Sequence, residues 1–212
     1  MRASLADQGS AGAAVGICTV AVGLGANLPS SVGDPIDTLQ AVRPKLEQCL
    51  RCVLGDARAA CWSPLFRTDP VGGPPDQPDY LNAVLIVESK ARPQRSQAAA
   101  LLGQLHELEH FFGRERLEHW GPRSLDLDLL WWGDLTIEEP ALQLPHPRWH
   151  QRAFVLAPLL AIERIKPFQA PRGYPPLTEL IEATQERLPR ALTAQSLGWP
   201  AGFGATNGYQ AN

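Results

Sequence analysis

Lysine is scarce in this 212-residue chain, since only three of its 19 basic side chains are lysines (Lys45, Lys90 and Lys166) and 16 are arginines. The net charge is −3, which excludes a broadly basic surface of the kind that coats nucleic acids. No segment is long and apolar enough to span a bilayer, so we expect no membrane association. With 44% hydrophobic and 19% charged residues, the composition is that of a globular domain with a sizeable core.

Cysteine is also sparse, with four residues at positions 18, 49, 52 and 61. Cys49 and Cys52 have CxxC spacing, but they lack the second pair that a zinc site needs, and they fall in a helical pattern. Free thiols are therefore the expected state, which fits a reducing, cytoplasmic location.

The N-terminus has an apolar run at 11–26 that imitates a secretory signal, but Asp7 and several glycines argue against one. We expect residues 1–13 to be a disordered extension and residues 14–167 to form the folded domain. Residues 168–212 should add a helix and a loose tail.

Apolar periodicity predicts a strand–helix–strand–strand–helix–strand order. The predicted elements are strands at 14–24, 59–66, 81–87 and 124–132 and helices at 34–52, 94–112 and, beyond the domain, 177–188. Asp34-Pro35 opens the first helix, and Pro44 should kink or split it. A turn at Gly133-Asp134 should lead into a short partner strand. This order predicts an α+β, ferredoxin-like fold, which is an antiparallel sheet with helices packed on one face, followed by C-terminal additions that end in a tail from residue 198.

Two carboxylates stand at alternate positions of the last predicted strand, in the sequence Leu125-Asp-Leu-Asp-Leu129. Because a strand alternates its faces with a period of two, Asp126 and Asp128 should point to one face and the leucines to the other. Neighbouring carboxylates repel each other without a cation, and Mg²⁺ binds proteins through one or two acids plus substrate phosphates. Arg123 lies just before the strand, where its guanidinium could reach a phosphate. This pattern favours a magnesium–phosphate site.

Two other motifs suggest different chemistry. His106-Glu-Leu-Glu-His110 matches the HExxH zinc-protease signature, but the third ligand expected downstream is missing, so a solvated helix face is favoured over a zinc hydrolase. Gly23-Leu-Gly-Ala-Asn27 lacks the third glycine of a dinucleotide fingerprint, and no Gly-Lys-Ser/Thr occurs. A nucleotide bound here is therefore not held by a P-loop.

Three blocks of sequence carry a family resemblance. They are Arg67-Thr68 through Asp76-Gln-Pro-Asp-Tyr-Leu-Asn82, Gly113-Arg114 through Trp120-Gly-Pro-Arg-Ser-Leu-Asp-Leu-Asp128, and Pro145-His146 through Arg152-Ala-Phe154. Over residues 18–165 the chain resembles the 6-hydroxymethyl-7,8-dihydropterin pyrophosphokinase family of folate biosynthesis. The resemblance implies that 14–167 is a pyrophosphokinase catalytic domain, which transfers diphosphate from ATP to the hydroxymethyl group of the pterin and releases AMP.

The resemblance also implies roles for single residues. The implied catalytic residues are Arg114, Arg123, Asp126 and Asp128, of which the two aspartates would hold two Mg²⁺ ions against the ATP phosphates. The implied ATP-binding residues are Glu109, Arg114, Arg116, Trp120, Arg123, Leu129, His146 and Arg152. The implied pterin-binding residues are Asn27, Thr68, Val71, Tyr80, Asn82, Trp120, Asp126 and Phe154. Among these, Tyr80 and Phe154 would sandwich the ring, and Asn82 would pair with its amide edge.

We expect a monomer whose partners are ATP and the pterin, with no nucleic acid and no membrane. The alternative from another functional class is a regulator that binds pterin or nucleotide without turnover. A zinc hydrolase built on the HExxH motif comes third.

Overall fold

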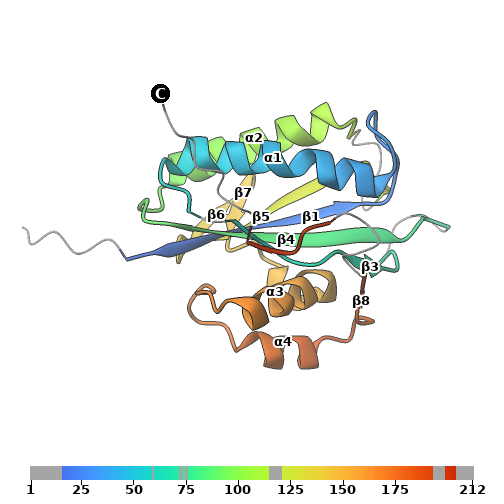
Figure 1. Ribbon diagram of the computed structural model, residues 1–212. Coiled ribbons are helices and arrows are strands. Elements are labelled where there is room, and N and C mark those ends of the chain that lie inside the picture. The colour runs from blue at the N-terminus through green and yellow to red at the C-terminus, as the bar shows by residue number, and fades with distance from the viewer. Residues whose placement is uncertain are drawn as a thin grey trace, which may run out of the picture.

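The computed structural model describes residues 16–58, 60–71, 74, 76–114, 121–192 and 199–203. At its centre is an antiparallel β-sheet with helices on both faces (Figure 1). Helices α1 (Pro35–Leu54) and α2 (Arg95–Phe111) cover one face, and α3 (Ala153–Ile165) and α4 (Leu177–Ala183) cover the other. None of the described helices combines the length and the apolar character that a membrane span requires.

The sheet has β4 at its centre. The strands of the described residues are β1 Cys18–Ala26, β2 Ala60–Trp62, β3 Phe66–Thr68, β4 Tyr80–Ser89, β5 Asp126–Trp132, β6 Ile137–Glu139, β7 Leu142–Leu144, β8 Arg190–Ala191 and β9 Gly202–Phe203. They follow the order β5-β1-β4-β2-β9, while β3 also pairs with β4 and is joined by β8. The predicted α+β class with an antiparallel sheet is confirmed.

Two predicted strands differ from the structure. The strand expected at 59–66 is two short strands, β2 and β3, because Pro64 between them has no N–H to donate to a ladder. The strand after the Gly133 turn does not pair with β5, since β6 pairs with β7 in a separate two-stranded sheet. That predicted pairing is wrong.

Helix α1 runs through Pro44 as one helix, so of the two predicted effects of this proline, a kink or a split, the split is wrong. Its N-terminus is closed by a capping box, in which the Asp34 side chain accepts from the N–H groups of Ile36 and Asp37. Its inner face buries several apolar side chains, Leu39, Val42, Leu46, Leu50 and Leu54. Each contributes about 1.5–3 kcal/mol when fully buried, which together exceeds the cost of about 3 kcal/mol for a proline inside a helix.

The sheet separates two hydrophobic clusters. Leu125, Leu127 and Leu129 belong to the cluster under α1 and α2, whereas Leu130 and Trp131 belong to the cluster under α3 and α4. A β-bulge in the β1–β5 ladder places the side chains of Leu130 and Trp131 on the same face of the sheet, the one that α3 covers. The expectation that helices pack on one face is therefore wrong, because α3, for which no element was predicted, buries the second apolar face.

The C-terminal addition takes part in the sheet. Helix α4 ends at Ala183, earlier than predicted, and β8 and β9 then pair with β3 and β2. Trp199 is fully buried, and the Arg43 guanidinium lies 4.4 Å from the ring centroids of both Trp62 and Trp199. The prediction of a loose tail is wrong for residues 199–203, and the rest of that predicted tail lies outside the described residues.

Candidate functional site

A cavity of about 260 Å³ opens on the α3 face of the sheet. Because β4 and β5 run antiparallel to β1, their first residues lie beside its last ones. The sheet therefore brings together side chains that are far apart in the sequence and form the floor of the cavity. Residues between 146 and 155 form one of its walls. The cavity lining contains Gly23, Gly25, Thr68, Val71, Tyr80, Asn82, Arg114, Arg123, Asp126, Asp128, His146, Arg148, Trp149, Arg152 and Phe154.

Gly25 keeps the sheet surface flat inside the cavity. It pairs with Asn82 on β4 and with Asp126 on β5, so the three positions share one face. A Cβ atom at this position would lie 3.0 Å from Oδ1 of Asn82, which is closer than side chains normally approach. A planar ligand can therefore lie over Gly25, between an amide and a carboxylate.

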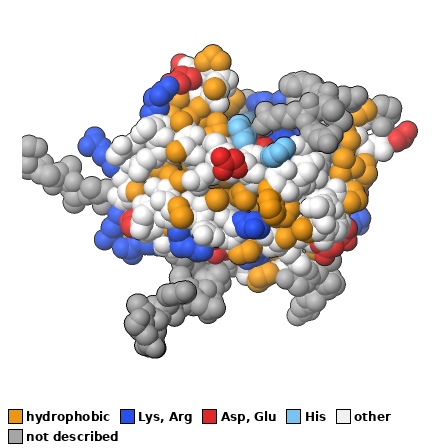
Figure 2. All heavy atoms as spheres, turned by 90° about the horizontal axis from the view of Figure 1, so that it is seen from above, with side chains coloured by type: hydrophobic (Ala, Val, Ile, Leu, Met, Phe, Trp, Pro, Cys, Tyr) orange, Lys and Arg blue, Asp and Glu red, His pale blue; other side chains and the backbone are white. Residues whose placement is uncertain are grey.

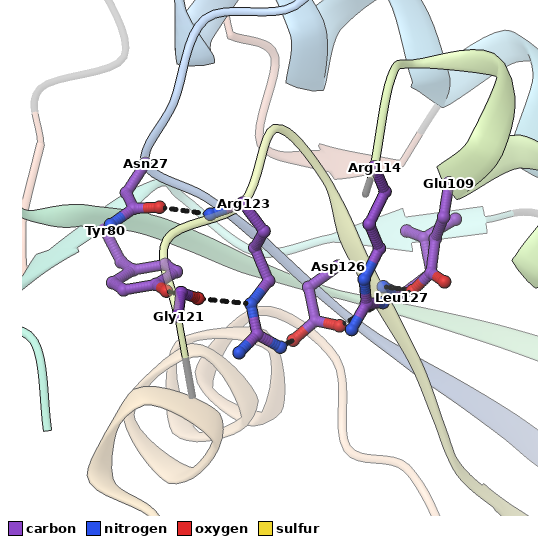
Figure 3. A network of polar contacts seen from close by, with 8 residues as sticks. All are labelled: Asn27, Tyr80, Glu109, Arg114, Gly121, Arg123, Asp126 and Leu127. Carbon is purple, nitrogen blue, oxygen red and sulfur yellow. Dashed lines mark hydrogen bonds and ion pairs between the residues drawn. The ribbon is translucent and has the colours of Figure 1, made fainter. Parts of the chain in front are cut away.

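Asp126 lies between two arginines (Figure 3). Its Oδ1 is 2.6 Å from Nη1 of Arg114, and its Oδ2 is 2.7 Å from Nη1 of Arg123. All three side chains are largely buried, with 14% to 22% of their surface exposed, so the charges are only weakly screened by solvent. The arrangement presents two guanidinium groups on either side of a carboxylate.

Glu109 holds Arg114 from the side of α2. Its carboxylate forms an ion pair with Nη1 of Arg114 and accepts a 2.8 Å hydrogen bond from the Leu127 N–H (Figure 3). Glu109 is only 2% exposed and does not line the cavity. It therefore fixes an arginine and the backbone of β5, and the direct ATP contact that the resemblance implies stays a prediction.

Asp128 is the most perturbed titratable group of the site. Burial first, and then the negative charges of Asp126 and Glu109, together raise the pKa of Asp128 to about 7, while Arg114 and Arg123 oppose the shift. A carboxyl group at such a position is ionised only in part at neutral pH. A cation placed beside it would favour the ionised form.

More basic side chains complete the cavity on the side of α3. Burial lowers the pKa of His146, and the nearby Arg148 and Arg152 lower it as well, against the opposing charge of Asp126. Arg152 lies with its guanidinium carbon 4.5 Å from the ring centroid of Phe154. This half of the cavity has the charge to bind the phosphates of a nucleotide.

The opposite half offers amide, hydroxyl and aromatic groups. Asn82 donates from Nδ2 to Oγ1 of Thr68 at 2.7 Å, and the Tyr80 hydroxyl donates to the Gly121 carbonyl at 3.1 Å. Asn27 is buried and does not line the cavity; it donates to the Pro78 carbonyl and accepts from the Arg123 N–H at 2.8 Å. Asn27 thus ties the loops around the site to the end of β1.

The HExxH motif lies on the opposite side of the sheet. His106, Glu107 and His110 are exposed on α2, and Figure 2 looks onto this side, where histidine side chains reach the surface. Within the part of the chain that the structure describes, no three His, Cys, Asp or Glu side chains form a group that could hold a metal. Asp126 and Asp128 supply two carboxylates, so a metal there would need substrate oxygens as further ligands.

The family model described as 7,8-dihydro-6-hydroxymethylpterin-pyrophosphokinase (HPPK) matches residues 21–164. The chain belongs to this family. The 2-amino-4-hydroxy-6-hydroxymethyldihydropteridine pyrophosphokinase of Haemophilus influenzae is 36% identical over 68% of this chain and 81% of the relative. The enzymes of the same name from a Synechocystis strain and from Pseudomonas aeruginosa are 37% and 38% identical, over 76% and 66% of this chain and 73% and 77% of the relatives.

A triple mutant of Plasmodium falciparum HPPK-DHPS aligns with 79% of this chain and 43% of its own, at a TM-score of 0.49 and 11% identity. This pair of values describes a distant likeness, and the family assignment rests on the sequence match.

Most of the HPPK residues expected from the sequence line one cavity. Among those described, three do not: Asn27 and Glu109 are buried behind it, and Leu129 is buried in the cluster under α1 and α2. Arg116 and Trp120 lie outside the described residues. The expected HPPK site is thus a mixture of cavity residues and residues that hold them.

Two kinds of cavity residue were not predicted from the sequence. Gly25 was seen only as part of a glycine motif, although its period-two spacing from Gly23 places both glycines on one face of β1. Arg148 and Trp149 line the cavity between His146 and Arg152, and their position in that third block was the available signal.

Proposed function

We propose that this chain transfers the diphosphoryl group of ATP to the hydroxymethyl oxygen of 6-hydroxymethyl-7,8-dihydropterin and releases AMP, as a step of folate biosynthesis. One observation carries the proposal. A single cavity joins paired carboxylates among arginines to a wall of amide and aromatic side chains. The relatives at 36% to 38% identity are named for this activity.

The paired carboxylates fit Mg²⁺. Carboxylate oxygens are the ligands that Mg²⁺ prefers, and Asp126 and Asp128 occupy alternate positions of β5 in the same cavity. We propose that these two residues hold two Mg²⁺ ions together with ATP phosphates. When bound, the ions would neutralise charge on the transferred group.

The arginines have a defined part in this proposal. Arg114 and Arg123 now contact the two oxygens of Asp126. When the Asp126 oxygens serve the metal, the two guanidinium groups are released to bind phosphate oxygens a short distance away. His146, Arg152 and the additional Arg148 would bind the remaining phosphate charge. Glu109 acts through Arg114 as a positioning residue.

The pterin would lie over Gly25. The Asn82 side chain offers both a donor and an acceptor to the amide and amino edge of the ring, while Tyr80 and Phe154 provide aromatic surfaces for stacking. Thr68 orients the Asn82 amide, and Val71 adds an apolar contact at the edge of the cavity. A ring with a different pattern of polar groups would leave Asn82 unpaired, and this gives strong discrimination.

The reaction is an in-line displacement. The hydroxymethyl oxygen forms a bond to the β-phosphorus of ATP, and the hydroxyl proton is released. The bond between the β-phosphorus and the oxygen that bridges it to the α-phosphorus breaks, and AMP leaves with this bridging oxygen. The protein contributes position and positive charge, which is the main form of catalysis in phosphoryl transfer.

We also propose a fold type, a domain boundary, an oligomeric state and a location for this chain. We infer that the strand order β5-β1-β4-β2, with every pair antiparallel, is a ferredoxin-like core, and that residues 14–167 are the catalytic domain, because the cavity is lined from Gly23 to Val155. We propose a monomer, because residues of one chain supply both the acidic and basic side chains and the amide and aromatic side chains of the cavity. The four free cysteines are consistent with the cytoplasm.

A product assay tests the proposed function. The full chain is incubated with Mg²⁺, ATP and reduced hydroxymethylpterin, and the nucleotides are separated by chromatography. AMP formed in proportion to pterin diphosphate is the expected result. ADP, or cleavage of added peptide with zinc, would overturn it, and tight binding of both substrates without product would favour the non-catalytic regulator.

A further inference from the structure

The segment between α4 and β8, residues 184–189, contacts the third sequence block near its end, at residues 151–153. Its end is fixed by the sheet, because Ala191 pairs with Phe66 of β3 and the Leu192 N–H donates to the Leu65 carbonyl at 2.8 Å. Its beginning is fixed by Thr184, whose hydroxyl donates to the Gln151 carbonyl at 3.3 Å. The segment is therefore held at both ends beside the first turn of α3.

Glu186 lies in this segment and uses both of its carboxylate oxygens. Oε1 forms an ion pair with Nε of Arg152 at 2.7 Å, without the geometry of a hydrogen bond, and Oε2 accepts a 2.8 Å hydrogen bond from the Ala153 N–H, the first N–H of α3. Both charged side chains are mostly buried, with 16% of Arg152 and 21% of Glu186 exposed. An ion pair shielded in this way can orient its partners much better than an exposed one.

The contact at Nε leaves the phosphate-binding capacity of Arg152 in place. A guanidinium has five N–H donors, so an ion pair at Nε is compatible with phosphate contacts through the two Nη groups. The same guanidinium lies over Phe154, at 4.5 Å from its ring centroid, and Phe154 lines the cavity. The Glu186 carboxylate thus orients Arg152, which lies on the phosphate side of the cavity. The Arg152 guanidinium in turn covers the ring of Phe154 on the pterin side.

We propose that Glu186 is a positioning residue of the active site, which holds Arg152 in the orientation that binds ATP phosphates and fixes the start of α3 beneath Phe154. The proposal rests on the proposed function, in which Arg152 contacts phosphate. It assigns a role in catalysis to the C-terminal addition, which lies outside the family match at residues 21–164.

The test is a double-mutant cycle with substitutions at Glu186 and Arg152. Glu186→Ala is expected to lower kcat/KM for ATP about tenfold, whereas in the Arg152→Ala background the same substitution should change it less than about twofold, because residues that act through one contact are not additive. Glu186→Gln, which keeps the size but loses the charge, should show an intermediate loss and guards against poor folding of the alanine variant.

Glu182→Gln is the matched control, since Glu182 is an exposed glutamate of α4 just before the segment and loses the same charge. It should keep kcat/KM within about twofold of the parent protein. Equal losses from the Glu186 substitutions with and without Arg152, or a loss that follows melting temperature in all variants, would overturn the proposal. A parent protein that forms no AMP would instead refute the proposed function.

Discussion

Asp128→Asn is expected to make the ligand-free protein more stable, and the gain should increase with pH. In the unfolded chain this carboxyl group ionises near its ordinary pKa of 3.8, while burial and the neighbouring acids raise its pKa to about 7 in the folded protein. Between these values the folded state holds a proton that the unfolded state has released. Stability therefore falls as pH rises through this window, and the loss is complete above the folded pKa.

The size of the effect follows from the shift. One pKa unit corresponds to about 1.36 kcal/mol, so a shift of about three units corresponds to at most about 4 kcal/mol at high pH. Asparagine stays neutral at every pH. The difference in unfolding free energy between Asp128→Asn and the parent should therefore increase by about 3 kcal/mol between about pH 4.5 and about pH 8.

Urea unfolding of both proteins at several pH values, without Mg²⁺, measures this difference. Asp134→Asn is the matched control, because hydrogen bonds from Arg172 lower the pKa of Asp134 below its ordinary value of 3.8. The stabilising contribution of this carboxylate is therefore already present at about pH 4.5, and the difference between Asp134→Asn and the parent should stay constant up to about pH 8. Added Mg²⁺ should reduce the advantage of Asp128→Asn, since a cation favours the ionised carboxylate. A difference that stays constant across the pH range would refute the explanation for the perturbed Asp128.

Three other substitutions test the site and the fold. Gly25→Ala should weaken pterin binding at least about tenfold without changing ATP binding, because the methyl group would crowd Asn82; unchanged pterin affinity in calorimetry would contradict this role. Glu109→Gln should lower kcat about tenfold, because it removes the charge that holds Arg114; steady-state rates equal to the parent would exclude that role. Trp199→Ala should cost about 3–5 kcal/mol of unfolding free energy in urea, since its ring is fully buried; a loss below about 1 kcal/mol would mean that this segment does not stabilise the fold.

Local sequence patterns alone predicted the orientation of the two paired carboxylates, Asp126 and Asp128. The alternation from Leu125 to Leu129 predicted which side chains are buried, and Leu125, Leu127 and Leu129 are indeed core residues while Asp126 and Asp128 line the cavity. The α+β class and the positions of α1, α2, β1, β4 and β5 were likewise predictable. Periodicity predicts α1, α2 and β5 because each has a buried apolar face and a more polar face, whereas β1 and β4, which are buried on both faces, are recognised as short apolar runs.

Helix α3 was not predicted because its sequence has little contrast between faces. Apolar residues occur nearly all around it, with Pro158 in the middle, and such a run fits a helix or a strand equally well. Its burial against Ala21, Val84 and Ile86 depends on a second apolar face of the sheet, which becomes visible only when all strands are paired.

By itself, the amino-acid sequence of this protein determined the family, the fold class and the positions of the paired acids in the cavity, because these depend on residue types at short, fixed spacings. The tertiary structure decided that Gly25 lies between Asn82 and Asp126, that Glu109 supports Arg114, and that Glu186 reaches Arg152 from the C-terminal addition. Those relations join residues that are distant in the chain, and strand pairing and helix packing, which no local pattern encodes, bring them within contact distance.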